Sequence, residues 1–211
     1  MAYAVQRSLG PNGRPWIGVC MVASIDGSTV FAGKSAGLSS DADRDVLLTL
    51  RSSADLIIVG AGTVRTEGYG IPRKYGQRIG VVSRTGRVDL DTPLFTSGAG
   101  FLILPQDAPP TSVDSVRAGV GELDLAAAIR ALPGDPAFVQ AEGGPSLNGA
   151  LAACDLIDEI NLTTSPQMIG GAGPRVTSDA PPLSHRFHLV HLLEDDGYLF
   201  SRYVRSDSGP V

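Results

Sequence analysis

Residues 56–67 read LIIVGAGTVRTE, and this stretch decides the fold class. Its first part, 56–59, is a short apolar run rich in β-branched residues, which is typical of a strand buried on both faces. Its second part, 60–64, starts with glycine, alanine and glycine and leads into a helix. A buried strand followed by a glycine-rich turn and a helix is typical of α/β proteins with a parallel sheet.

The rest of the chain repeats this alternation and then changes. Further buried strands are predicted at 16–23, 78–82, 101–104 and 137–141, and helices at 41–51, 123–132 and 147–153. Beyond residue 158, polar and apolar residues alternate at 159–163 and 187–191, and a third strand follows at 198–204; these read as antiparallel strands. The sequence therefore predicts an α/β fold with a mostly parallel mixed sheet, antiparallel C-terminal strands and helices on both faces.

The domain organisation is predicted to be simple. Residues 10–13 read GPNG, which is turn chemistry without apolar periodicity, so 1–14 are expected to form a flexible N-terminal arm. Residues 15–206 are expected to form a single domain, a length that one hydrophobic core can support. No internal repeat or low-complexity block interrupts it.

Composition and charge exclude several classes of function. The net charge of −5 argues against a protein that coats nucleic acid or binds membranes through basic residues. The N-terminus lacks the plan of a signal peptide, and the longest apolar run is too short to span a bilayer. His185, His188 and His191 alternate along a strand and cannot converge, so no metal is expected. We expect a cytoplasmic protein with a small-molecule substrate and with neither nucleic acid nor membrane as a partner.

A second glycine-rich junction, Gly143-Gly144-Pro145-Ser146, follows the strand at 137–141. A helix N-terminus offers free N–H groups and a partial positive charge, both of which suit phosphate. Glycine lets the backbone approach such an anion closely. Gly62 and the Gly143–Gly144 pair are therefore candidates for binding a dinucleotide, with a purely structural role as the alternative for each junction.

The strand at 78–82 ends at Ser83 and Arg84, which bear on the choice of cofactor. In dinucleotide-binding domains an acidic residue at such a place holds the ribose 2′-hydroxyl, whereas a hydroxyl and a guanidinium match a 2′-phosphate. The third glycine of the Rossmann fingerprint is absent. These residues indicate NADPH rather than NADH, unless Arg84 is only a solvated loop residue.

Several stretches together resemble a known family. They are Ala23-Ser24-Ile25-Asp26-Gly27, Arg51, residues 55–64, Val81-Val82-Ser83, residues 142–147, Asp158-Glu159 and the Pro166-x-x-Ile169-Gly170-Gly171 motif. In this combination and order the chain resembles the reductase domain of riboflavin biosynthesis, which is the C-terminal domain of a bifunctional deaminase-reductase. That family has a dihydrofolate-reductase-like fold, which also occurs in stand-alone pyrimidine reductases. The resemblance implies a homodimer that reduces 5-amino-6-(5-phosphoribosylamino)uracil by hydride transfer from NADPH.

The resemblance also implies roles for particular residues. Substrate binding is implied for Ser35, Arg51 and Glu142, while Asp26 and Glu142 are the candidate catalytic carboxylates. The expected cofactor-binding residues, with those of the two junctions included, are Ala23, Gly62, Thr63, Glu67, Ser83, Arg84, Gly143, Gly144, Pro145, Ser146 and Leu147. Two alternatives stay open. Arg51 can be a salt-bridge partner at a helix end rather than a phosphate ligand, and Asp26 can serve only its own turn.

Two departures from the family pattern concern the substrate more than the cofactor. An aromatic residue common in the family is replaced by Gly37, and a common Asp-Asp-Pro motif is replaced by Glu67-Gly68-Tyr69-Gly70. Dihydrofolate (pterin) reductase activity on the same fold is therefore an alternative function. A non-catalytic NADP-binding sensor is a second alternative.

Overall fold

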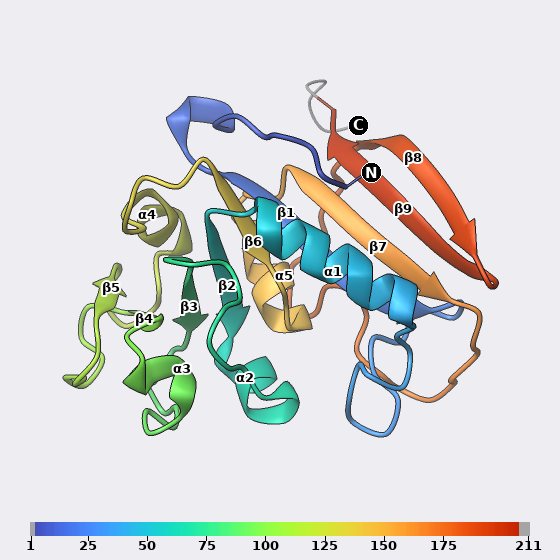
Figure 1. The fold of residues 1–211 in the computed structure, drawn as a ribbon. Coiled ribbons are helices and arrows are strands. Elements are labelled where there is room, and N and C mark those ends of the chain that lie inside the picture. Colours follow the sequence, from blue (N-terminus) through green and yellow to red (C-terminus); the bar gives the residue numbers. More distant parts are fainter. Residues whose placement is uncertain (1–2, 207–211) are drawn as a thin grey trace.

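The computed structural model describes residues 3–206, which form a nine-stranded sheet with helices on both faces, as predicted (Figure 1). The strands are β1 (Trp16–Ser24), β2 (Leu56–Gly60), β3 (Arg78–Val82), β4 (Gly100–Leu104), β5 (Ser115–Arg117), β6 (Phe138–Ala141), β7 (Glu159–Ser165), β8 (Phe187–Asp195) and β9 (Tyr198–Arg205). The helices are α1 (Asp41–Ser53), α2 (Ala61–Glu67), α3 (Pro93–Thr96), α4 (Leu125–Arg130) and α5 (Pro145–Ala153), with a short 3-10 turn, η1 (Pro11–Gly13). The strand order is β5-β4-β3-β2-β6-β1-β7-β9-β8.

Strand β7 joins the parallel and antiparallel parts of the sheet. It pairs in parallel with β1 on one side and antiparallel with β9 on the other. The expectation that β7 is an antiparallel-type strand is therefore half right, because alternating burial reports which face a residue occupies and not the direction of its neighbour. The short elements β5 and α3 were not predicted, since three or four residues carry no periodic pattern.

Alternate residues of the central strands pack into two separate cores. In β2, Leu56 and Ile58 pack in the cluster that includes residues of α4 and α5. Ile57 and Val59 pack on the other face, with residues of α2 and α3. The continuous apolar run of β2 is explained by this burial on both faces.

The described part of the expected N-terminal arm lies against the sheet. Tyr3 is 5% exposed, and the buried guanidinium of Arg7 donates to Glu159 of β7 over 2.9 Å. Arg14 binds Asp158 with two hydrogen bonds, of 2.6 and 2.8 Å. Tyr3, Arg7 and Arg14 are thus buried against the sheet, while most other residues between them are exposed. The expectation of a flexible arm over 1–14 stays a prediction. The proposed domain limits at 15 and 206 remain a prediction.

The described residues also bear on membrane-spanning segments and on metal sites. No helix within residues 3–206 is both long enough and apolar enough to cross a membrane. In the same part of the chain, histidine, cysteine and acidic side chains nowhere gather in a group of three or more that could hold a metal ion.

Candidate functional site

The two glycine-rich junctions meet at one edge of the sheet. Strands β2 and β6 are neighbours in the sheet, and the amide of Gly60, the last residue of β2, donates to the Gly143 carbonyl over 2.7 Å. A Cβ atom on Gly144 would lie 2.7 Å from the Thr63 hydroxyl oxygen. A side chain at position 144 would therefore force the Thr63 hydroxyl to move, and glycine lets these two segments of the chain approach closely. The helix starts of α2 and α5 stand side by side as a result, and we call them the glycine wall.

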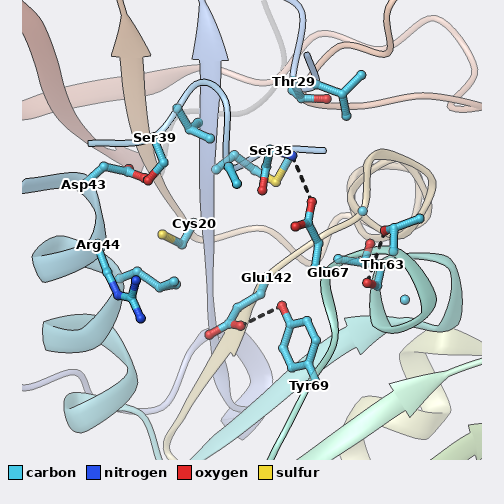
Figure 2. A pocket seen from close by; sticks show the side chains of 18 of the residues that line it. Cys20, Thr29, Ser35, Ser39, Asp43, Arg44, Thr63, Glu67, Tyr69 and Glu142 are labelled. Carbon is cyan, nitrogen blue, oxygen red and sulfur yellow. Dashed lines mark hydrogen bonds between the residues drawn. The ribbon is translucent and has the colours of Figure 1, made fainter. Parts of the chain in front are cut away.

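A cavity of about 1040 Å³ opens beside the glycine wall (Figure 2). Its other lining comes from β1, the loop at 29–36, the first turns of α1 and the segment after α2. Ten of the predicted site residues line it: Ser35, Arg51, Gly62, Thr63, Glu67, Glu142, Gly144, Pro145, Ser146 and Leu147. A cavity at the carboxyl ends of parallel strands is where open α/β sheets bind ligands.

The helices around the cavity begin in two different ways. The Ser40 side chain accepts a hydrogen bond from the Asp43 amide and caps α1, as the sequence predicted for this helix start. The glycine wall has no such cap, because Gly60 before α2 and Gly144 before α5 offer no side chain. The first-turn N–H groups of α2 and α5 therefore remain available to an anionic ligand.

Four hydrogen bonds converge on the carboxylate of Glu142 at the floor of the cavity. The Arg51 guanidinium donates two, of 2.7 and 2.6 Å, and forms a bidentate ion pair. The Tyr69 hydroxyl and the Gln140 amide each donate one, over 2.9 Å. A carboxylate has about four acceptor sites, so these donors occupy all of them. The acceptor sites of Glu142 are thus occupied within the protein, and its catalytic role stays a prediction.

Arg51 is held by Glu142, which is the alternative that the sequence left open. Burial opposes the charged form of Arg51, but its hydrogen bonds to Glu142 and the negative charge of that carboxylate raise its pKa above the usual value. Its side chain remains 32% exposed and lines the cavity. The expected role as a free phosphate ligand is corrected to that of a paired cation at the cavity floor.

Asp26 does not line the cavity, which favours the alternative that it serves its own turn, and its catalytic role stays a prediction. Its carboxylate accepts hydrogen bonds from the Ser24 hydroxyl and from the backbone amides of Ile169 and Gly170. These bonds lower the pKa of Asp26 to about 2, with the Ser24 bond contributing most. The side chain therefore ties its own turn to the loop that follows β7.

Four other predicted residues also lie outside the cavity lining: Ala23, Ser83, Arg84 and Gly143. Ser83 is buried, and its hydroxyl accepts a hydrogen bond from the Gly86 amide within its own turn. Arg84 is exposed at the end of β3, the strand next to β2. Gly143 lies behind Gly144, and the peptide bond between the two is cis.

The loop at 29–36 is joined to α2 across the cavity. The Ser35 amide donates to a carboxylate oxygen of Glu67 over 2.9 Å (Figure 2). Both residues were expected in the site, as substrate and cofactor ligands, but the structure shows them bound to each other. Glu67 therefore fixes the position of the loop that carries Ser35.

Two cavity residues were missed by the sequence analysis. Arg44 of α1 and Arg73, in the segment after α2, line the cavity and are exposed. Neither forms an ion pair with any residue that the structure describes. Their signal was weak, because a charged residue on a helix or loop is usually only a solvated side chain.

These features define the class of protein: an α/β domain with a ligand cavity at the carboxyl edge of a mostly parallel sheet. Residues 15–199 match the family described as the RibD C-terminal domain, and the chain belongs to that family. The predicted fold class and the predicted reductase family are thereby confirmed.

Three similar proteins illustrate the range of the family. A 2,5-diamino-6-ribosylamino-4(3H)-pyrimidinone 5′-phosphate reductase from Methanothermobacter thermautotrophicus is 25% identical over 85% of this chain and 90% of its own. The riboflavin biosynthesis protein RibD of Bacillus amyloliquefaciens is 26% identical over 76% of this chain but only 48% of its own. A solved pyrimidine reductase-like protein from Corynebacterium diphtheriae superposes with a TM-score of 0.81, covering 92% of this chain and 93% of its own at 24% identity.

Proposed function

We propose that this chain transfers hydride from NADPH to a phosphorylated ribosylaminopyrimidine. The names of the relatives support a pyrimidine substrate. The observation that carries the proposal is the cavity of about 1040 Å³, which is lined by the uncapped glycine wall and by Arg44 and Arg73, two arginines without an ion-pair partner among residues 3–206. Such a cavity has room for a ring compound beside the reactive end of a dinucleotide.

The glycine wall fits a nicotinamide dinucleotide. No side chain caps α2 or α5, and Gly144 leaves the backbone open where a Cβ atom would collide with Thr63. Gly62, Thr63, Gly144, Ser146 and Leu147 would bind the pyrophosphate through backbone N–H groups, whereas Pro145 has none to donate. When bound, the nicotinamide supplies the hydride, and the protein holds and orients it.

The preference for NADPH over NADH rests on the end of β3. Val82 of β3 is in register with Gly60, so the following residues lie one strand away from the glycine wall. Arg84 is exposed there and makes no ion pair with a described residue. A guanidinium in this place matches the 2′-phosphate that distinguishes NADPH.

The substrate phosphate is proposed to lie between Arg44 and Arg73. Both arginines line the cavity, and a guanidinium binds phosphate through two parallel hydrogen bonds. Arg51 contributes positive charge from the floor, but Glu142 already occupies one edge of its guanidinium. A phosphorylated substrate therefore fits this side of the cavity better than a neutral ring.

The test is to follow NADPH oxidation by absorbance with three candidate substrates. We expect turnover with the 2,5-diaminopyrimidinone ribosyl phosphate or with the corresponding aminouracil, and none with dihydrofolate. Turnover of dihydrofolate alone would replace the proposal by the pterin alternative. Tight NADPH binding without turnover of any of the three would favour a sensor.

A homodimer is proposed from the edge of the sheet. Strand β8 is the outermost strand at one side of the sheet. It exposes about half of the surface of four apolar residues, Leu189, Val190, Leu192 and Leu193. An apolar edge strand favours association with a second copy of the chain. Light scattering of the purified protein tests this, and Leu192→Glu should convert a dimer into a monomer.

The remaining expectations about location and partners are predictions only. We propose a cytoplasmic enzyme whose partner is its small-molecule substrate. The expectation that it binds neither nucleic acid nor membranes rests on the acidic net charge of −5 and stays a prediction.

A further inference from the structure

Tyr69 differs from the other groups that bind Glu142. Gln140 belongs to strand β6 and Arg51 to helix α1, so the main-chain hydrogen bonds of those elements fix both. Tyr69 lies in the segment 68–77 between α2 and β3, which forms neither helix nor strand. Gly68 before it has a φ of +72°, which takes the chain out of the helical path and turns Tyr69 towards Glu142.

Tyr69 also contacts the ion-pair partner of Glu142. The guanidinium carbon of Arg51 lies 5.5 Å from the centre of the Tyr69 ring, within the range of a cation–π contact. Arg51 and Tyr69 both line the main cavity and a smaller one of about 390 Å³. One side chain thus holds the carboxylate through its hydroxyl and the guanidinium through its ring.

We propose that Tyr69 is a positioning residue that fixes the Glu142–Arg51 pair at the cavity floor. This inference rests on the proposed reductase function. The Tyr69 hydroxyl donates to the fourth acceptor site of Glu142, so the carboxylate cannot rotate towards solvent. Arg51 follows the carboxylate through its two hydrogen bonds and presents its remaining N–H groups to the substrate.

The environment of Tyr69 suits a hydrogen-bond donor rather than an acid. Burial raises the pKa of the phenol well above its usual value, and the nearby charge of Glu142 raises it further. The hydroxyl therefore keeps its proton at neutral pH. It acts on the substrate only through Glu142 and Arg51.

A double-mutant cycle on the turnover number tests this coupling. Tyr69→Phe keeps the ring but removes the donor, and we expect kcat to fall about tenfold, as for the loss of one hydrogen bond to a charged group, with the KM for NADPH unchanged. In a Glu142→Gln background the same change should lower kcat by less than about twofold, because the two residues act as one unit. An equal loss in both backgrounds, or no loss in the wild type, would overturn the proposal.

Tyr75 provides the matched control. It lies in the same segment and is fully exposed, so Tyr75→Phe makes the same chemical change without removing a contact. We expect its kcat to equal that of the wild type. A tenfold loss in Tyr75→Phe would show that the segment is merely sensitive to substitution, and would overturn the assignment to Tyr69.

Alkaline titration of the phenol absorbance tests the contact independently of turnover. We expect Tyr69, identified by the difference from Tyr69→Phe, to ionise well above the ordinary value of about 10. Glu142→Gln should lower the pKa of Tyr69, because it removes the neighbouring negative charge. An unchanged titration in Glu142→Gln would refute the contact. If the wild type reduced no pyrimidine, the proposed function would fail while this contact could still hold.

Discussion

The sheet has two edges formed by the ends of its strands, and the polar groups at these two edges differ in whether they are bonded within the protein. At the edge where β1 and β7 begin, Arg7 and Arg202 both bind the buried carboxylate of Glu159, and Arg14 binds Asp158. At the edge where β2 and β6 end, two helix starts have no side-chain cap, and the cavity beside them is lined by Arg44 and Arg73, which form no ion pair within the described part of the chain. The first edge pairs these charged groups within the chain, whereas the second keeps donors for a ligand.

This contrast locates function better than charge alone. Both edges are rich in charged residues, so their composition does not separate them. The difference lies in whether the partner of each donor is already in the protein. We therefore expect substitutions at the first edge to change stability, and substitutions at the second to change binding.

The largest effect concerns the first edge, where β1 and β7 begin, and it appears as a dependence of stability on pH. The hydrogen bonds and charges of Arg7 and Arg202 outweigh burial and lower the pKa of Glu159 from 4.5 to about 2. Because the pKa is lower in the folded state, this stabilisation, about 3 kcal/mol, is complete above pH 4.5 and is lost as the pH falls towards 2. Urea denaturation of the wild type and of Glu159→Gln across this range measures it. An equally steep decline in Glu159→Gln would contradict the assignment.

The next effect concerns the support of the glycine wall. A Cβ atom on Gly149 of α5 would lie 1.9 Å from the backbone oxygen of Ser178. Gly149→Ala must therefore displace the loop from the helix, and we expect it to lower the free energy of unfolding by about 1–3 kcal/mol and to weaken NADPH binding. Gly70→Ala is the control, since nothing lies within 4 Å of its Cβ position. Equal stability of the two variants would argue against this packing.

A smaller effect is expected at the capped helix. Ser40→Ala removes the acceptor for the Asp43 amide at the start of α1. It should lower the free energy of unfolding by about 1 kcal/mol, the usual contribution of an N-cap. Because this helix start is already satisfied, the affinity for NADPH should not change, which calorimetry can verify. A large loss of affinity would contradict the claim that only the uncapped helix starts bind NADPH.

The smallest effect is expected at Arg84, which is exposed. Arg84→Ala should weaken NADPH binding by less than about fivefold, because an exposed ion pair contributes at most about 1 kcal/mol. NADH binding should be unaffected, since that cofactor has no 2′-phosphate. Thermal-shift titrations with the two cofactors measure the difference, and an equal loss for both would remove Arg84 from the site.

The fold and the glycine wall could be predicted because both depend on neighbours in the sequence. The apolar run at 56–59 indicates a buried strand. Ser40 indicates the start of a helix, because its side chain accepts a hydrogen bond from an amide only three residues later. A glycine after a strand indicates a place where the backbone must be approached closely. Such signals lie within one element, so a single sequence contains them.

The pairing of charged residues could not be predicted, because it joins residues that are distant in sequence. Arg51 and Glu142 were each expected to bind substrate, yet they are 91 positions apart and bind each other. Asp26 was expected to be catalytic, but its partner amides are 143 and 144 positions away. Arg44 and Arg73 became candidates only when the structure showed that they line the cavity and form no ion pair with a described residue.

Steady-state kinetics of Gly144→Ala and Arg44→Ala, with cofactor and substrate varied in turn, tests the central claim most directly. The claim is that the uncapped glycine wall binds NADPH and that Arg44 and Arg73 bind the substrate phosphate. Gly144→Ala should raise the KM for NADPH several-fold and leave that for the substrate unchanged, while Arg44→Ala should do the reverse. The same change in both KM values for both variants, or the opposite pattern, would contradict the account.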